Sequence, residues 1–75
     1  GGVLMFVFHS SVGTFWIKPH QGRYVLGIND DAIGSYHSAV AAADDVFTHA
    51  TGHFPWDKLD GIEEGPTDIY EWEHN

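Results

Sequence analysis

The stretch "GSYHSAVAAADDVFTHATG", residues 34–52, decides the fold class of this chain. Ser38 stands where a helix N-cap belongs, because its hydroxyl can accept the first free amide protons of a helix. An alanine-rich run follows, and Gly52 suits the left-handed conformation of the residue that ends a helix. The sequence therefore predicts one α-helix over about residues 39–50.

The predicted helix has one apolar stripe, with residues at positions i, i+3, i+7 and i+10 and two flanking residues. This stripe is expected to face a sheet. Because its alanines are small, the helix should lie close to that sheet, and the strands must supply the aromatic side chains. The stripe consists of Val40, Ala43, Phe47 and Ala50, flanked by Ala39 and Val46.

Four segments before the helix have the alternation and β-branched or aromatic content of strands. The first segment is apolar on both faces, so both faces are expected to be buried by other parts of the protein or by a partner. Pro19 is expected to end the second strand, and Pro19–Gly22 to form the turn of a hairpin. The predicted strands are residues 3–10, 14–18, 23–28 and 32–37, joined as a meander.

The segments after the helix give weaker patterns. His53–Leu59 indicates a single helical turn, pinned to the body by Phe54, Trp56 and Leu59. Asp68–His74 alternates, with Tyr70 and Trp72 on one side, which predicts a charged edge strand; a frayed tail is the alternative. The predicted fold is α+β: an antiparallel sheet of three to five strands with one helix across a face.

One domain is expected over residues 1–75, because a chain of this length supports a single thin core. Gly1-Gly2 is either native or a cloning remnant, and Met5 is an alternative start. The chain has no cysteine, which excludes disulfides and thiolate metal sites. A metal ion held by oxygen and nitrogen ligands and oligomerisation are the two other sources of stability, and we expect oligomerisation.

Residues 22–52, "GRYVLGINDDAIGSYHSAVAAADDVFTHATG", show a Gly-x-aromatic step, a serine cap and an alanine-rich helix with an acidic residue. In order of elements this resembles the sheet-plus-helix core of plant AP2-type and phage-integrase amino-terminal DNA-binding domains. It is also similar to small uncharacterised bacterial proteins with the pattern Gly-x-Tyr-x-Ser-x-x-Ala-Ala-Ala-Asp-Asp. The resemblance implies the fold. The DNA-binding families carry several arginines and tryptophans on the sheet, whereas the matching strands here offer Trp16, Lys18 and Arg23.

Charge excludes some classes of partner. Eleven acidic residues against three basic ones give a formal net charge of −8. Such a chain repels phosphate backbones and anionic membranes, so neither nucleic acid nor a membrane is an expected partner. The apolar run Val3–Phe8 is too short to span a membrane and lacks the features of a signal peptide. A soluble cytoplasmic protein is expected.

Asp44-Asp45 and the nearby histidines are the candidates for chemistry. Adjacent carboxylates on a helix diverge by about 100°, so they do not share a ligand. Asp45 and His49, four residues apart, are expected to face each other as a solvated pair. His49, His53 and Asp57 are weak candidates for a metal site, because Gly52 interrupts the helix between the two histidines.

No catalytic residues and no cofactor are predicted. The serines lack a Gly-x-Ser-x-Gly elbow, and the glycines are too far apart for a phosphate loop. Asn29–Asp31 lacks the spacing and closing glutamate of a calcium-binding EF-hand, so it indicates a turn. No set of acid, base and stabiliser can be assembled, which disfavours an enzyme.

Aromatic residues remain, and either they exceed what a small core is expected to enclose or all of them pack under the carboxy-terminal segment. The first alternative gives the following predictions. Exposed aromatic residues predict a non-enzymatic interaction module that self-associates as a homodimer or binds a protein partner. The alternatives are a binding protein for a cationic or aromatic ligand and an acidic mimic of nucleic acid. The candidate surface residues are Trp16, Tyr36, Phe54, Trp56, Tyr70 and Trp72.

Overall fold

The structure of the chain is a computed structural model that describes residues 5–74. Gly1-Gly2, and the part of the expected first strand at Val3-Leu4, lie outside the described residues. The elements in chain order are β1 (Phe6–Ser10), β2 (Gly13–His20), β3 (Arg23–Ile28), β4 (Asp31–Tyr36), α1 (Ala39–Phe47), α2 (Phe54–Asp57), the 3₁₀ helix η1 (Ile69–Glu71) and β5 (Glu73–His74).

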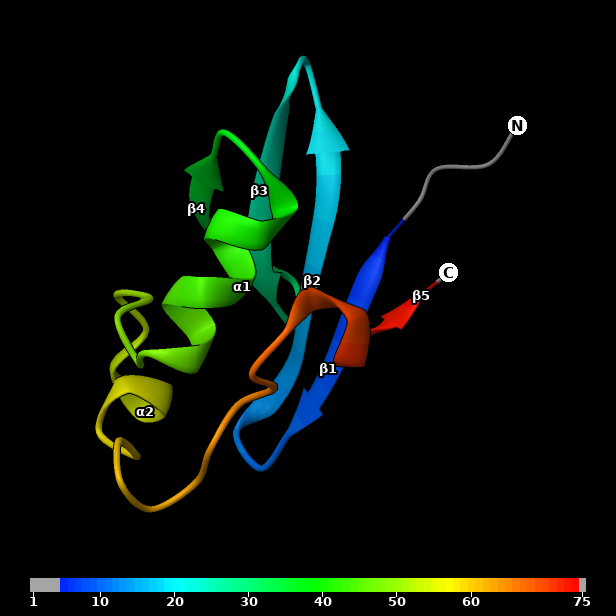
Figure 1. Cartoon of the computed structure of the whole chain (residues 1–75). Helices are drawn as coiled ribbons and strands as arrows, with labels where there is room; N and C mark the ends of the chain where they lie inside the picture. The colour runs from blue at the N-terminus through cyan, green and yellow to red at the C-terminus, as the bar shows by residue number, and fades with distance from the viewer. Residues whose placement is uncertain (1–4, 75) are drawn as a thin grey trace.

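The described strands form one antiparallel sheet of five strands in the order β4-β3-β2-β1-β5. Figure 1 shows α1 and η1 in front of this sheet, with the meander β1 to β4 behind them. The α+β prediction is confirmed, and the C-terminal strand lies at the sheet edge as expected.

The hairpin β2–β3 turns later than the sequence predicts. Pro19 does not end β2, because it pairs with Tyr24 and the strand continues to His20. A proline is tolerated there because, within residues 5–74, β1 pairs with β2 only as far as Ile17, so no described residue on the β1 side needs the missing amide proton. The turn is Gln21-Gly22, both with positive φ (50° and 79°), as a two-residue type I′ turn requires.

Helix α1 begins as predicted and ends earlier. The Ser38 hydroxyl accepts a hydrogen bond from the Ala41 amide at 3.1 Å, which confirms the N-cap. The helix ends at Phe47 rather than Ala50, because His49 takes the left-handed conformation (φ 58°) that was expected of Gly52. The amides of His49 and Ala50 then donate to the carbonyls of Val46 and Asp45, which is a Schellman ending.

The apolar stripe of α1 is rotated from the predicted one. Ala42, Ala43 and Val46 are buried against the sheet, whereas Val40 is 62% exposed and Phe47 and Ala50 also face outward. The prediction for Val40, Phe47 and Ala50 was therefore wrong. Packing against β2, β3 and β4 selects the narrow alanine side of the helix, because this side allows the closest approach.

The core is completed from the C-terminal third of the chain. Trp56 of α2 and Trp72 pack on Phe8 of β1, with ring centroids 5.8 and 5.6 Å apart. The other core residues are Phe15, Ile17, Leu26, Ile28, Ala42, Ala43, Val46 and Ile69.

The segment 68–74 is only partly a strand. Residues 69–71 form η1, so Trp72 points into the core while Tyr70 is 82% exposed. The prediction that Tyr70 and Trp72 share one face was wrong, because a helical turn replaces the period-2 alternation of a strand. β5 retains two residues, which pair with Phe6 and Val7 of β1.

Candidate functional site

One face of the sheet carries no covering element among the described residues. The three helices each place a buried residue in the same core, so all of them lie on the side of Phe15 and Leu26. Side chains alternate along a strand, so the residues between these core positions project from the opposite face. That opposite side is called the open face below.

A row of paired residues crosses the open face perpendicular to the strands. Val7 pairs with Trp16, Trp16 with Gly27, and Gly27 with Ala32. Val25 lies beside this row, paired with Lys18. The open-face stripe is defined as Val7, Trp16, Val25, Gly27 and Ala32. Three residues of the stripe, Trp16, Val25 and Ala32, line a shallow hollow of about 390 Å³ together with Lys18, His20 and Asp30.

Trp16 is held in one orientation in this stripe. Its indole Nε1 donates a hydrogen bond of 2.7 Å to the Asn29 carbonyl. Its ring lies over Gly27, where a Cβ atom would approach the ring Cζ2 to 2.0 Å. The Lys18 ammonium stands 5.1 Å from the ring centroid. A fixed aromatic ring on a face without a covering layer suits binding, because little side-chain entropy remains to be lost.

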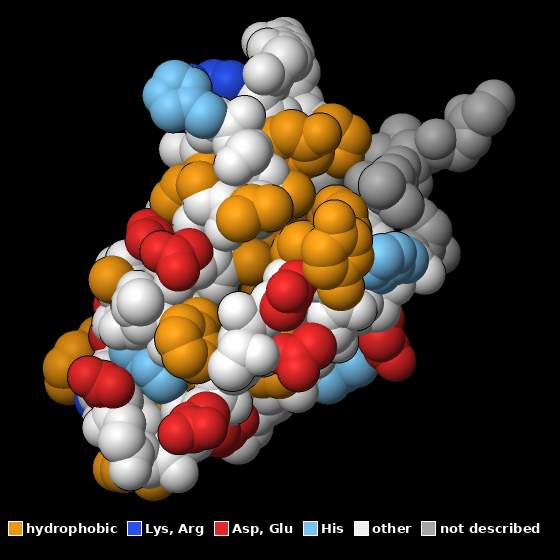
Figure 2. All heavy atoms as spheres, viewed as in Figure 1, with side chains coloured by type: hydrophobic (Ala, Val, Ile, Leu, Met, Phe, Trp, Pro, Cys, Tyr) orange, Lys and Arg blue, Asp and Glu red, His pale blue; other side chains and the backbone are white. Residues whose placement is uncertain are grey.

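Charge is segregated between the two sides of the molecule. The segment 37–72, which contains the three helices, carries eight acidic residues and one lysine, a net charge of −7. Residues 5–36, which form β1 to β4, carry two acidic and two basic residues and are neutral. Figure 2 shows the helical side, where Asp and Glu side chains are spread over the surface and Lys or Arg is visible only at its margin.

Many of these acidic residues tie the chain to itself. Glu63 accepts hydrogen bonds from the amide and hydroxyl of Ser11, which fastens the loop after α2 to the β1–β2 turn. Glu71 accepts from the amide and hydroxyl of Thr67, and this lowers the pKa of the Glu71 carboxyl. Carboxylates therefore supply contacts both between distant segments and within the C-terminal segment of a chain that has no cysteine.

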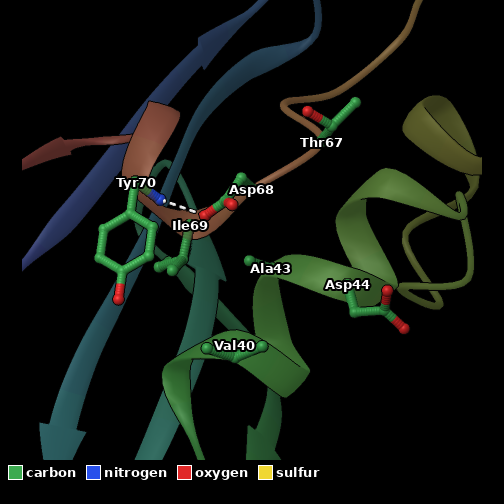
Figure 3. A pocket seen from close by; sticks show the side chains of 7 residues that line it. All are labelled: Val40, Ala43, Asp44, Thr67, Asp68, Ile69 and Tyr70. Atoms are coloured by element: carbon green, nitrogen blue, oxygen red, sulfur yellow. Dashed lines mark hydrogen bonds between the residues drawn. The ribbon is translucent and has the colours of Figure 1, made fainter.

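A groove on the helical side is the second concave feature. It has a volume of about 240 Å³ and lies between α1 and the segment 67–70 (Figure 3). Ala43 and Ile69 lie between Tyr70 and Asp44, which stand on opposite sides of the view. The lining residues are Val40, Ala43, Asp44, Thr67, Asp68, Ile69 and Tyr70.

The six aromatic residues expected to form one partner surface are dispersed. Trp56 is fully buried and Trp72 is 3% exposed, so the expectation that they lie at the surface was wrong. Both rings pack on Phe8 of β1, and Trp56 also packs on Phe15 and His49. Phe54 and Tyr70 are exposed on the helical side. Trp16 is half-buried on the open face.

Tyr36 belongs to the helical side and has a partner within the chain. Its hydroxyl donates a 2.7 Å hydrogen bond to Asp45 of α1. Burial, with this hydrogen bond as the second cause, raises the pKa of the Tyr36 hydroxyl well above its ordinary value. Tyr36 therefore ties β4 to α1, which leaves Trp16 as the aromatic residue of the open face.

The expected pair of Asp45 and His49 does not form, because the left-handed backbone at position 49 turns the imidazole elsewhere. Asp45 accepts from Tyr36, whereas His49 stacks on Trp56 with ring centroids 4.4 Å apart. The His49 Nε2 atom lies 2.7 Å from the Glu63 carbonyl oxygen. His49 thus holds α1, α2 and the following loop together.

The weak metal candidates are used differently. Both oxygens of the Asp57 carboxylate accept hydrogen bonds, from Thr51 and from Gly52. His53 is the N-cap residue of α2, and His49 is stacked on Trp56. Within residues 5–74, no group of three or more His, Cys, Asp or Glu side chains is placed to hold a metal ion.

Sequence reasoning missed most of the open-face stripe and the groove. Gly27 was the available signal, because a glycine inside a strand often marks the close approach of another group. No comparable signal marks the other apolar residues of the stripe. Which residues lie beside Val7, Val25 and Ala32 depends on how the strands pair, and the sequence alone does not give this strand register. Val40 and Asp44 line the groove only because α1 is rotated.

Comparisons of the chain with protein families, with curated proteins and with solved structures found no match. The resemblance of residues 22–52 to AP2-type and integrase domains thus stays a prediction. No helix within residues 5–74 is long and apolar enough to cross a membrane.

Proposed function

We propose that this chain is a small non-enzymatic interaction module that forms a homodimer through the open face of its sheet. The observation that carries the proposal is the open-face stripe, a row of apolar residues across the sheet with a fixed tryptophan at its centre. A sheet with apolar residues on both faces is normally covered on both sides. A second copy of the chain would supply the missing layer.

The distribution of charge favours this face over the helical side for self-association. Two helical sides facing each other would bring two net charges of −7 together, which is unfavourable. The open face carries both signs: Lys18 and Arg23 lie on it with Asp30 and Glu73 at its borders. Two open faces can therefore approach without a large repulsion.

The test is the mass of the protein in solution, measured by light scattering after gel filtration at micromolar to millimolar concentrations. The unmodified chain is expected at twice the mass of one chain. Ala32→Glu, an exposed position of the stripe, should shift the protein to a single chain because it places a charge in the contact. Circular dichroism shows whether each variant is folded.

Phe54→Glu is the matched control, because it adds the same charge at an exposed apolar residue on the helical side. This variant should remain a dimer. A single chain for the unmodified protein at millimolar concentration overturns self-association. A dimer that survives Ala32→Glu and dissociates with Phe54→Glu assigns the contact to the other side and overturns the proposed surface.

A binding protein for a cationic ligand is the second candidate function, favoured by the groove on the acidic helical side. Two of its lining residues, Asp44 and Asp68, are carboxylates, and Tyr70 supplies an aromatic face. Titration of the protein with tetramethylammonium, followed by NMR, tests this function. Shifts at residues 40–44 and 67–70 with micromolar affinity support it, and their absence up to millimolar concentrations contradicts it.

A further inference from the structure

The groove between α1 and the segment 67–70 has an apolar floor and exposed apolar walls. Ala43 and Ile69 are buried beneath it, while Val40 and Tyr70 are largely exposed at its rim. The exposure of Val40 follows from the rotation of α1, which puts alanines against the sheet and leaves the valine outside. An apolar rim over a concave floor is the arrangement in which one apolar side chain of a partner can be enclosed.

The polar groups of the groove are all acidic or neutral. Asp68 uses one carboxylate oxygen to accept from the Tyr70 amide, and its other oxygen has no hydrogen bond within the described residues. Figure 3 shows the Asp44 side chain on the other side of Ala43 from Tyr70, with its carboxylate pointing away from Tyr70. The groove therefore joins an apolar floor to two carboxylates, inside a segment of net charge −7.

We propose that this groove docks a short segment of a partner protein in which lysine or arginine stands next to an apolar side chain. The apolar side chain would occupy the space over Ala43 and Ile69, and the cation would face Asp44 or Asp68. The argument for this occupant is charge complementarity, because a carboxylate beside an apolar contact favours a cationic segment over an acidic one.

A peptide segment fits the groove better than a small quaternary ammonium ion does. Cages for such ions surround the cation with several aromatic rings, whereas Tyr70 is the only aromatic residue that lines this groove in the described chain. The volume of about 240 Å³ holds one or two side chains, so a short segment is sufficient. So small a contact predicts weak and reversible binding.

The experiment uses the full chain and two blocked peptides, Gly-Lys-Leu-Arg-Gly and the same peptide with glutamate in place of lysine and arginine. NMR shift mapping in low salt follows the titration. The basic peptide is expected to shift the amides of residues 40–44 and 67–70, and the acidic peptide to leave them unchanged. Added salt should weaken the binding, since partly exposed charges are screened.

Variants of matched charge separate this groove from the general acidity of the chain. Asp44→Asn and Asp68→Asn should each weaken the affinity about three- to tenfold, as expected for the loss of one partly exposed charge pair. Asparagine at position 68 can still accept from the Tyr70 amide, so η1 is preserved. Glu64→Gln removes the same charge from an exposed residue outside the groove and should leave the affinity unchanged.

Three results overturn the proposal. The first is equal weakening by Glu64→Gln with shifts over the whole helical side, which would indicate a diffuse acidic field such as a nucleic-acid mimic presents. The second is binding of tetramethylammonium to the same residues at lower concentration than the peptide, which would assign the groove to small cations. The third is the absence of shifts at millimolar peptide. None of these results depends on the mass measured for the dimer.

Discussion

The indole ring of Trp16 lies directly over Gly27 on the open face of the sheet, and position 27 has no room for a side chain beneath it. The two residues are paired across β2 and β3, and the ring is fixed by the hydrogen bond from its Nε1 to the Asn29 carbonyl. The Trp16 ring shields the backbone of Gly27 from solvent. Because Gly27 has no side chain, the ring can pack directly on that backbone.

Gly27→Ala should therefore destabilise the protein by about 2 kcal/mol, because the new methyl group forces the ring out of its position. Urea unfolding measures this loss, and the NMR signal of the Trp16 indole proton reports whether its hydrogen bond is broken. In a Trp16→Ala background the same change should cost far less, since the obstruction is gone. Equal losses in the two backgrounds would show that the ring and the glycine are not coupled.

Replacing His49 by glycine should have two opposite effects on stability, one through the backbone and one through the side chain. The positive φ of His49 favours glycine, so His49→Gly relieves the backbone. The same change removes the stacking on Trp56 and the hydrogen bond to the Glu63 carbonyl. We expect a net loss of about 2 kcal/mol in the free energy of unfolding, because a packed ring outweighs the backbone preference. Stability equal to or above that of the unmodified chain would refute the structural role of the imidazole.

Asp57 should matter more than other acidic residues of the helical side. Its carboxylate accepts from the Thr51 amide and hydroxyl and from the Gly52 amide, and so it holds the turn between α1 and α2. Asp57→Ala is expected to cost about 2 kcal/mol in urea unfolding, because two backbone amides lose their acceptor. Asp44→Ala, at an exposed residue, should stay within about 0.5 kcal/mol. Similar losses for both variants would contradict the tethering role of Asp57.

Alkaline pH should weaken the contact between β4 and α1. The pKa of Tyr36 is raised in the folded chain, so its contribution to stability is complete below the ordinary pKa near 10 and is lost as the pH rises above that value. The midpoint of thermal unfolding should therefore fall between pH 9 and about pH 11. Tyr36→Phe, which has no proton to lose, should fall less over the same interval. Parallel curves for the two proteins would contradict this assignment.

Acidic pH should loosen the turn before η1. The Thr67 hydroxyl and amide hold the pKa of Glu71 below its ordinary value of 4.5, so the contribution of this contact is complete above that value and is lost as the pH falls below it. Glu71→Gln should show a smaller decrease in stability between pH 6 and about pH 3 than the unmodified chain. Thermal unfolding followed by circular dichroism makes the comparison. If the stability of Glu71→Gln decreased more steeply than that of the unmodified chain, the contact between Glu71 and Thr67 would not be the cause of the acid sensitivity.

Local signals in the sequence were sufficient for the order of the elements. Alternation placed β3 correctly, and the hydroxyl at Ser38 marked the start of α1. The chain around Gln21-Gly22 was correctly predicted as a hairpin, although the turn was placed two residues too early. Strand alternation, helix caps and hairpin turns each depend on residues that are close together in the chain. They can therefore be predicted from the sequence alone.

The sequence by itself determined an antiparallel sheet with one main helix and an acidic helical segment. Only the tertiary structure decided which side of α1 is buried, because the apolar residues of α1 lie around most of its circumference and are mostly small alanines. Packing also decided that Trp56 and Trp72 enter the core while Trp16 remains on the open face. That choice depends on contacts between residues far apart in the chain, such as Phe8 with Trp72, which no local pattern encodes.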